Sequence, residues 1–215
     1  MGGPDPYSAS KGAAELAIRS YVKSYFSHPN NKIHIGIGRA GNVIGGGDWA
    51  SDRIVPDCVK AWSGNQIVEL RNPFATRPWQ HVLEPLSGYI NLAAELYTNK
   101  SMHGEPFNFG PPASQNHTVI ELVEQMSLYW EQVRWKDVSK DNNGPYESGL
   151  LKLNCDKALH YLKWQAIMDF DQTIRMTTEW YKSFYDVKRP IIEVTREQIN
   201  KYTEIARQKN IKWAL

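Results

Sequence analysis

The sequence has 215 residues, 41% of them hydrophobic, so it can fold around one sizeable core or two small ones. Its 25 basic and 23 acidic residues give a net charge of +2, which argues against a protein built mainly to grip nucleic acid. Residues 1–6 lack the features of a signal peptide and no segment has the ~20 apolar residues of a membrane span, so we expect a cytoplasmic protein.

The first part of the chain predicts a helix, a strand and a glycine-rich loop in succession. Residues 8–26 carry apolar side chains at helical spacing. Residues 33–38 alternate isoleucine with other residues, as in a strand, and the two glycines of this strand indicate that another backbone or a ligand comes close. Residues 41–48 form a loop rich in glycine. The helix should turn inward a face made of Ala14, Ala17, Ile18, Tyr21, Val22 and Tyr25.

The middle of the chain continues this alternation. We expect a short helix at 54–62, a strand at 66–70, a helix at 85–97 and a brief strand at 107–110. Pro85 is well placed in the first turn of the helix expected at 85–97. That helix should bury Leu86, Ile90, Ala93 and Tyr97.

The last part is predicted to be helical on either side of a polar loop at 137–149. Helices are expected at 119–130, 173–185 and 195–208. Because helices and strands mix along the chain, the fold class is α/β. A complete doubly wound domain normally opens with a strand and a glycine-rich phosphate loop, whereas a helix comes first here. The last helix should turn inward Ile199, Tyr202, Ile205 and Ala206.

A tyrosine–lysine pair at the start of the first helix is the first candidate for chemistry. Tyr7 and Lys11 are four residues apart, so they project from the same helical face. A phenol titrates near pH ~10, and a nearby ammonium lowers its pKa, so the pair can move protons on and off a hydroxyl group. The alternative is a solvated tyrosine and lysine on a helix.

Two loops are candidates for binding a diphosphate. The triple glycine at 45–47 lets backbone amides approach a ligand, and the following helix start suits an anion; the alternative is a flexible turn. In the second loop, Arg71 and Arg77 can clamp phosphate oxygens while Trp79 stacks on a base. The alternative there is that both arginines form surface ion pairs and the tryptophan is core. We interpret His81 as structural.

In this order the motifs resemble the extended short-chain dehydrogenase/reductase family, over roughly residues 1–186. Tyr-x-x-x-Lys starts a helix, and a strand then leads into Arg-Ala-Gly-Asn-Val-Ile-Gly at 39–45. The resemblance implies that Tyr7 is the catalytic acid/base and that Lys11 binds the nicotinamide ribose of NAD beside it. It also implies that Arg39 and Asn42 line a sugar-nucleotide site.

Within the family, the residues at 45–49 and 52–56 are similar to the CDP-glucose 4,6-dehydratase branch. Residues 77–84 resemble the family's Arg-Pro-Trp-Gln-His-Val-Leu-Glu block almost without a break. The resemblance implies that Arg77 touches the substrate diphosphate. The segment at 146–154 matches loosely, and its Glu147 is best explained as an exposed glutamate. The implied substrate-binding set is Arg39, Asn42, Gly47, Asp48, Arg53, Ile54, Val55, Arg71, Arg77 and Trp79.

The resemblance implies the C-terminal portion of a Rossmann-like doubly wound domain (1–48 and 81–110) and a smaller α/β sugar-nucleotide-binding domain (49–80 and 111–190). Residues 191–215 would form a tail helix that matches no family pattern. The family's Gly-x-x-Gly-x-x-Gly loop would precede residue 1, so we expect these residues alone to be inactive and to bind NAD weakly or not at all. Bare apolar helix faces predict a homo-oligomer; no metal, nucleic acid or membrane partner is expected.

The implied reaction converts CDP-glucose to CDP-4-keto-6-deoxyglucose, a step of deoxysugar and lipopolysaccharide synthesis. Tyr7 would take the proton from the sugar O4 while hydride leaves C4 for NAD, water would be lost across C5 and C6, and the hydride would return to C6. One alternative is a sugar-nucleotide 4-epimerase or another extended member. The other is a non-catalytic piece that binds a sugar nucleotide or merely folds. Lys163 departs from the family, which usually has glycine there.

Overall fold

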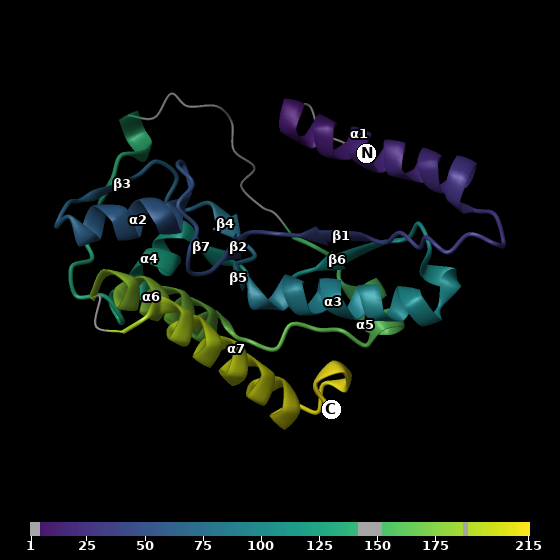
Figure 1. Cartoon of the computed structure of the whole chain (residues 1–215). Helices are drawn as coiled ribbons and strands as arrows, with labels where there is room; N and C mark the ends of the chain where they lie inside the picture. Colours follow the sequence, from purple (N-terminus) through teal and green to yellow (C-terminus); the bar gives the residue numbers. More distant parts are fainter. Residues whose placement is uncertain (1–4, 142–151, 187–188) are drawn as a thin grey trace.

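The computed structural model describes residues 5–141, 152–186 and 189–215 (Figure 1). Helix α1 (Pro6–Tyr21) begins where the Asp5 carboxylate accepts a hydrogen bond from the Ser8 amide at 2.9 Å, and a π-helical turn (Val22–Phe26) extends it. The helix predicted at 8–26 is therefore confirmed. Its predicted inward face is largely wrong, because only Val22 of that face is buried and the tyrosines are exposed.

Two parallel strands form the centre of the half of the fold that contains α1. Strand β1 (Ile37–Ala40) pairs in parallel with β6 (Pro106–Phe109), and α1 and α3 (Leu83–Thr98) lie on opposite sides of them (Figure 1). The strand predicted at 33–38 is confirmed only from Ile37 onward. A Cβ atom at Gly38 would lie 2.5 Å from the Tyr89 ring, so the close neighbour of this strand is helix α3.

Helix α3 has the predicted extent but packs through a different face. Leu86, Ile90, Ala93 and Tyr97 are all exposed, Tyr97 by 87%, so the prediction that they turn inward is wrong. The cause is Gly88, where a Cβ atom would lie 2.2 Å from the Phe109 ring. Without a side chain at that position the helix lies close against β6, and its buried residues are Glu84, Pro85, Gly88, Leu92 and Leu96.

The remaining strands are short pairs. The strand predicted at 66–70 is confirmed at its C-terminal end, and the two-residue strands are too short for a sequence pattern to predict. The pairs are parallel β2 (Val43–Ile44) with β5 (Gln80–His81), parallel β3 (Val68–Leu70) with β8 (Trp135–Asp137), and antiparallel β4 (Thr76–Arg77) with β7 (His117–Thr118).

Helices α2 (Ile54–Ser63), α4 (Val119–Ser127) and α6 (Phe170–Asp186) surround the largest hydrophobic core. All three confirm predicted helices, whereas the short α5 (Asp156–Leu162) is not predicted. A second core lies between α3, α5 and β6 and includes Phe109 and Trp164. Short 3₁₀ turns occur at Lys100–Met102, Ser139–Asp141 and Lys212–Ala214.

The C-terminal helix α7 (Ile191–Gln208) packs against α6, and the predicted helix at 195–208 is confirmed. Tyr202 and Ala206 are buried as expected, whereas Ile199 is exposed. Within the residues that the structure describes, no helix combines the length and apolar character needed to cross a bilayer.

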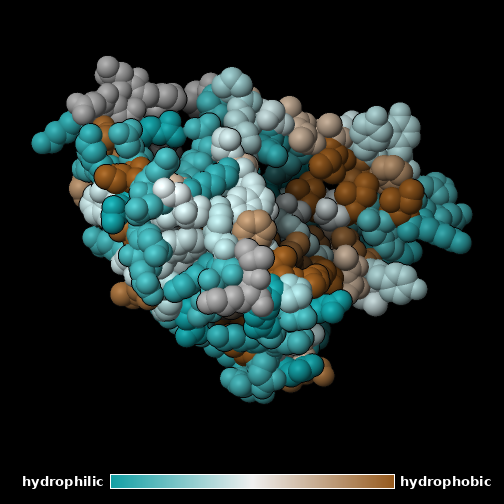
Figure 2. Space-filling view, turned by 60° about the vertical axis from the view of Figure 1, so that its left-hand side comes forward, coloured by the Kyte–Doolittle hydropathy of each residue, from teal (hydrophilic) through white to brown (hydrophobic). Residues whose placement is uncertain are grey.

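Hydrophobic side chains gather around a hollow on one side of the space-filling view (Figure 2). One cleft of the fold, of about 270 Å³, is apolar and lies between β1 and α3. Large exposed hydrophobic residues also occur on both helices that flank the strands: Tyr7, Leu16 and Tyr21 on α1, and Leu86, Tyr89, Ile90 and Tyr97 on α3.

Candidate functional site

The candidate site lies where the parallel strands β1 and β6 end. Parallel strands present their carboxyl ends at one edge, which is where α/β folds bind ligands. Gly41 and Gly110 follow the two strands, and Cβ atoms there would lie 3.3 and 3.4 Å from the Cδ1 atom of Leu153. Gln80 joins the same edge, because its Nε2 donates to the Phe109 carbonyl at 3.0 Å. Segments distant in sequence therefore meet at this edge.

The tyrosine–lysine pair lies at the N-terminal end of α1, which points toward the carboxyl end of β1 (Figure 1). The Lys11 Nζ atom is 5.4 Å from the centroid of the Tyr7 ring, so the two side chains share one face, as their spacing predicts. Tyr7 is 71% exposed, so its side chain is open to a ligand. Its catalytic role stays a prediction.

Arg39 is held by a residue that the sequence analysis missed. Its Nε and Nη2 donate to Oε1 and Oε2 of Glu15, both at 2.5 Å. This hydrogen-bonded pair raises the pKa of Arg39 and lowers that of Glu15. The pair ties α1 to β1. Glu15 lies one turn after Lys11 on the same face of α1, and that spacing was the available signal. A contact between Arg39 and a substrate stays a prediction.

Asn42 presents an unsatisfied acceptor beside the strand edge. Its Oδ1 atom is buried and has no hydrogen-bond partner among the described residues, whereas its carbonyl accepts from the Gln80 amide at 3.1 Å. Leaving such an atom unpaired costs about 1–3 kcal/mol. A ligand hydroxyl that donated to it would remove this cost, so Asn42 suits the predicted substrate contact.

His81 lies in the buried strand β5. Its Nδ1 atom accepts from the Leu83 amide at 3.3 Å, and burial lowers the pKa of the imidazole to about 4. The ring is therefore neutral at physiological pH and ill suited to be a general acid. This environment agrees with the structural role expected from the sequence.

The glycine-rich loop is a tight turn. Gly47 has φ of +85°, a conformation that favours glycine. The Asp48 side chain accepts from the Ala50 amide and from Nη1 of Arg53, both at 3.0 Å. Its carbonyl accepts from the Tyr181 hydroxyl at 2.7 Å. These bonds hold the turn in one conformation in the structure, and its binding of a diphosphate stays a prediction.

The other predicted binding residues divide by burial. Arg71 is exposed and pairs with Asp52 at 3.5 Å, and Nη1 of the half-buried Arg77 donates to the carbonyl of the preceding residue at 2.9 Å. Val55 is 2% exposed and Trp79 5%, and both pack in the largest core. The structure thus gives these two a packing role and leaves no open face of Trp79 for a base. Ile54 is half-buried at the start of α2, and Glu147 lies outside the described residues.

A buried carboxylate follows β5 and was also missed. Glu84 is 1% exposed, and its Oε1 accepts from the amides of Ile167 and Met168 at 2.9 and 2.7 Å. Its Oε2 accepts from the Tyr202 hydroxyl at 2.9 Å, which links α7 to α3. Burial raises the pKa of Glu84, and the three hydrogen bonds oppose that shift.

The residues fit only part of a dinucleotide site. Residues 36–41 have the Gly-x-Gly-x-x-Gly spacing, but they form and flank strand β1, and a Cβ atom at Gly36 would collide with Leu96. A phosphate-binding loop needs a turn between a strand and a helix N-terminus. Tyr7 and Lys11 suit the nicotinamide ribose, whereas this glycine run does not suit the phosphates.

Solved structures define the class of the fold. The chain matches dTDP-glucose 4,6-dehydratase from Bacillus anthracis with a TM-score of 0.65 at 19% identity, over 89% of this chain and 56% of that one. It matches UDP-glucuronic acid 4-epimerase from Bacillus cereus with a TM-score of 0.70 at 17% identity, over 84% and 54%. The chain therefore shares the fold of about half of each of these dehydratase and epimerase structures, which confirms the expected α/β class.

Sequence comparison narrows this class. The chain is 44% identical over 189 residues to CDP-glucose 4,6-dehydratase of Salmonella typhimurium, which covers 86% of this chain and 52% of that protein. It is 22% identical over 191 residues to dTDP-D-glucose 4,6-dehydratase of Mus musculus, over 86% and 50%. The chain is thus similar in sequence to CDP-glucose and dTDP-glucose 4,6-dehydratases, as its motifs indicate, and spans about half the length of these relatives. No protein-family model matches it.

Proposed function

We propose that this chain supplies the sugar-nucleotide side of a 4,6-dehydratase that converts CDP-glucose to CDP-4-keto-6-deoxyglucose. The observation that carries the proposal is the Tyr7–Lys11 pair beside the carboxyl end of β1, in a chain 44% identical to a CDP-glucose 4,6-dehydratase. The domain boundaries given above, a cytoplasmic location and a place in lipopolysaccharide synthesis belong to this proposal.

In the proposed site, Tyr7 takes the proton of the sugar O4 hydroxyl and later returns it. Lys11, whose Nζ lies 5.4 Å from the centroid of the Tyr7 ring, holds the nicotinamide ribose beside the tyrosine. Asn42 accepts a hydrogen bond from the substrate through its unpaired Oδ1 atom. NAD, held at its ribose by Lys11, would supply a reversible acceptor for the hydride.

The diphosphate is assigned to the arginine-containing loops. Arg71 and Arg53 have largely exposed side chains, at 61% and 62%, so each can turn toward a phosphate. Their present partners are aspartates of residues 48–52, and surface ion pairs of this kind are worth about 0–1 kcal/mol. A diphosphate with two or more charges can replace those partners. Arg77 completes the proposed set.

The test is a hybrid enzyme in which these residues replace the matching part of the Salmonella relative. With NAD and CDP-glucose, we expect the hybrid to release a product lighter by one water, detected by mass spectrometry. The 215-residue chain alone should show no turnover and no micromolar binding of NAD by calorimetric titration. A hybrid that folds and binds NAD but leaves CDP-glucose unchanged would refute the proposal.

A second candidate function is 4-epimerisation, because the epimerase structure from Bacillus cereus has a TM-score of 0.70. An epimerase would yield an isomer of unchanged mass, so the same experiment separates the two reactions. The carboxyl and hydroxyl groups that would decide between them are not among the assigned residues.

We also propose that the chain self-associates. The exposed apolar residues of α1 and α3 form the kind of surface that is usually covered in a folded protein. Light scattering should give at least the mass of a dimer for the 215-residue chain, and a monomer at high concentration would refute this part of the proposal.

A further inference from the structure

The C-terminal helix α7 matches no expected motif, yet its Thr195 hydrogen-bonds Trp180 of α6. Trp180 in turn contacts the glycine-rich loop at residues 45–49. We propose that Trp180 is a positioning residue of the sugar-nucleotide site: α7 holds its indole ring, and the indole fixes the backbone of that loop. This inference rests on the function proposed above and deepens it. It gives the C-terminal helix a role in the site.

The loop backbone lies directly against the indole. A Cβ atom at Gly46 would lie 1.9 Å from Cδ2 of Trp180 and 2.1 Å from Cγ, and real Cβ contacts are essentially never below 3.0 Å. At Gly47, a Cβ atom would be 3.6 Å from Cη2 of the same ring. The loop therefore follows the indole over two successive residues, and any movement of the ring moves the loop.

Helix α7 fixes the ring through one hydrogen bond. The Nε1 atom of Trp180 donates to Oγ1 of Thr195 at 2.9 Å. That hydroxyl donates in turn to the Ile191 carbonyl at 3.0 Å, so a lone pair remains directed at the indole. Phe184, one turn later on α6, stacks nearly parallel to Trp180, with centroids 5.8 Å apart. The indole is thus held at its polar edge and by a neighbouring ring.

The adjacent residue holds the same loop at a second point. The Tyr181 hydroxyl donates to the Asp48 carbonyl at 2.7 Å, and its ring meets Trp49 edge to face at 5.3 Å. Because both anchors come from successive residues of α6, they form a rigid template for the loop. The Trp180 anchor is the one that Thr195 of α7 holds by a hydrogen bond.

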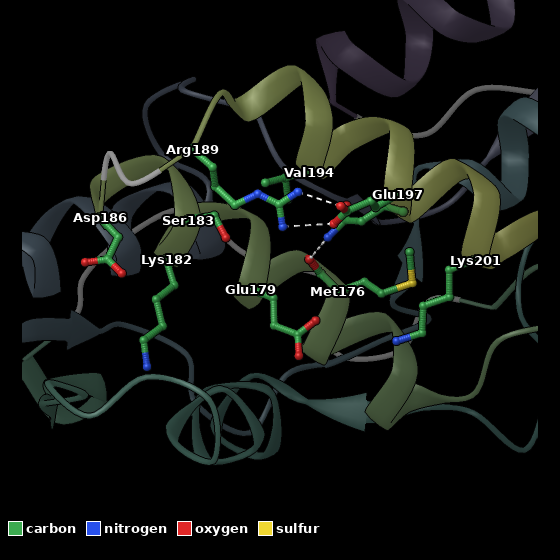
Figure 3. A pocket seen from close by; sticks show the side chains of 10 residues that line it. Met176, Glu179, Lys182, Ser183, Asp186, Arg189, Val194, Glu197 and Lys201 are labelled. Carbon is green, nitrogen blue, oxygen red and sulfur yellow. Dashed lines mark hydrogen bonds and ion pairs between the residues drawn. The ribbon is translucent and has the colours of Figure 1, made fainter.

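The two helices are joined independently of Thr195. Figure 3 shows the cleft between them, of about 380 Å³. Arg189, just before α7, donates to both oxygens of Glu197 on α7 at 3.1 and 2.5 Å, which ties the start of α7 to its own helix. Gln198 on α7 donates to the Met176 carbonyl on α6 at 2.6 Å. The contact of Gln198 with Met176 on α6 and that of Tyr202 with Glu84 on α3 keep α7 in place when the Thr195 hydroxyl is removed. Thr195→Val therefore probes the indole contact and not the docking of the helix.

Hydrogen exchange of the 215-residue chain tests the inference without any ligand. Thr195→Val and Trp180→Leu should raise amide exchange in residues 45–49 by about tenfold or more, because loop opening becomes easier. Thr195→Ser keeps the hydroxyl and should match the wild type. Thr203→Val makes the same chemical change on α7, where the hydroxyl only meets the Ile199 carbonyl, and should also have no effect. Unchanged exchange in Trp180→Leu would overturn the inference.

Kinetics of the hybrid enzyme separate positioning from general stability. Trp180→Leu should raise KM for CDP-glucose about tenfold and leave kcat within about twofold, since Tyr7 is untouched. Gly46→Ala should also raise KM, and adding Trp180→Leu should recover part of the loss by making room. A lower melting temperature with unchanged KM would overturn the inference. No turnover by the unsubstituted hybrid would count against the proposed function alone, and the exchange result would still decide the role of Trp180.

Discussion

Replacing Glu84 measures how strongly the buried network holds α3, α7 and the segment before α6 together. Glu84→Ala removes the acceptor of three hydrogen bonds of 2.7–2.9 Å, from the amides of Ile167 and Met168 and from the Tyr202 hydroxyl. Each buried donor left without a partner costs about 1–3 kcal/mol, and water can restore part of that. We therefore expect the free energy of unfolding to fall by about 3–5 kcal/mol.

Glu84→Gln is the matched control. Its amide oxygen can accept from both backbone amides, and its NH₂ group can donate to the Tyr202 oxygen, which already lies 2.9 Å from Oγ of Ser87 and can donate there. The free energy of unfolding should stay within about 1 kcal/mol of the wild type. Urea titration followed by tryptophan fluorescence measures both variants. The network's role would be refuted if Glu84→Gln lost as much unfolding free energy as Glu84→Ala, or if Glu84→Ala lost none.

The wild type and Glu84→Gln should also differ in how their free energy of unfolding depends on pH, and the sign of this difference is defined. Burial raises the pKa of Glu84 above its usual 4.5, so the folded state binds this proton more tightly than the unfolded chain does. The stability contributed by the group is complete below pH 4.5 and is lost as the pH rises through the raised pKa. Relative to Glu84→Gln, the wild type should therefore become less stable with rising pH, and a difference that grew in its favour would contradict this reasoning.

Three further substitutions test single residues. Tyr7→Phe in the hybrid enzyme should lower kcat about 10²–10⁴-fold with the fold intact. Near-normal turnover would show that Tyr7 is a solvated surface tyrosine without a catalytic role. Arg77→Ala should weaken substrate binding by about 1.5–3 kcal/mol, seen as a KM at least about tenfold higher, and unchanged kinetics would argue against a diphosphate contact. Lys163 has φ of 52°, so Lys163→Gly should raise the free energy of unfolding by about 0.5–1 kcal/mol, while Lys163→Ala should not; equal gains would refute the strain argument.

Most helices could be predicted because apolar periodicity is a local signal. α2, α3 and α6 lie within three residues of their expected ends. The buried face of α3 could not be predicted, because apolar residues occur on both sides of that helix. The choice between the two faces depends on Gly88, which admits the Phe109 ring, and a contact between segments distant in sequence leaves no periodic trace.

The candidate site shows the same division. The proximity of Tyr7 and Lys11 follows from helical spacing alone. The contacts that support the site join distant segments: Arg39 is 24 residues from Glu15, and Tyr202 is 118 residues from Glu84. For Trp79, the local sequence pointed away from the packing that the structure shows. A tryptophan near two arginines suggests a platform for stacking a base, whereas Trp79 is buried in the core that also contains residues of α2 and α4.

The close approach of Gly46 to Trp180 also constrains how relatives of this chain can diverge. A larger residue at position 46 can be accommodated only if the side chain at position 180 shrinks or turns away, because the two occupy one volume. Substitutions at these sites should therefore be inherited as a pair, with either single change disfavoured by selection. A collection of homologous sequences should show the two positions covarying although 134 residues separate them, and the C-terminal half of α6 should evolve in step with a loop near the beginning of the chain.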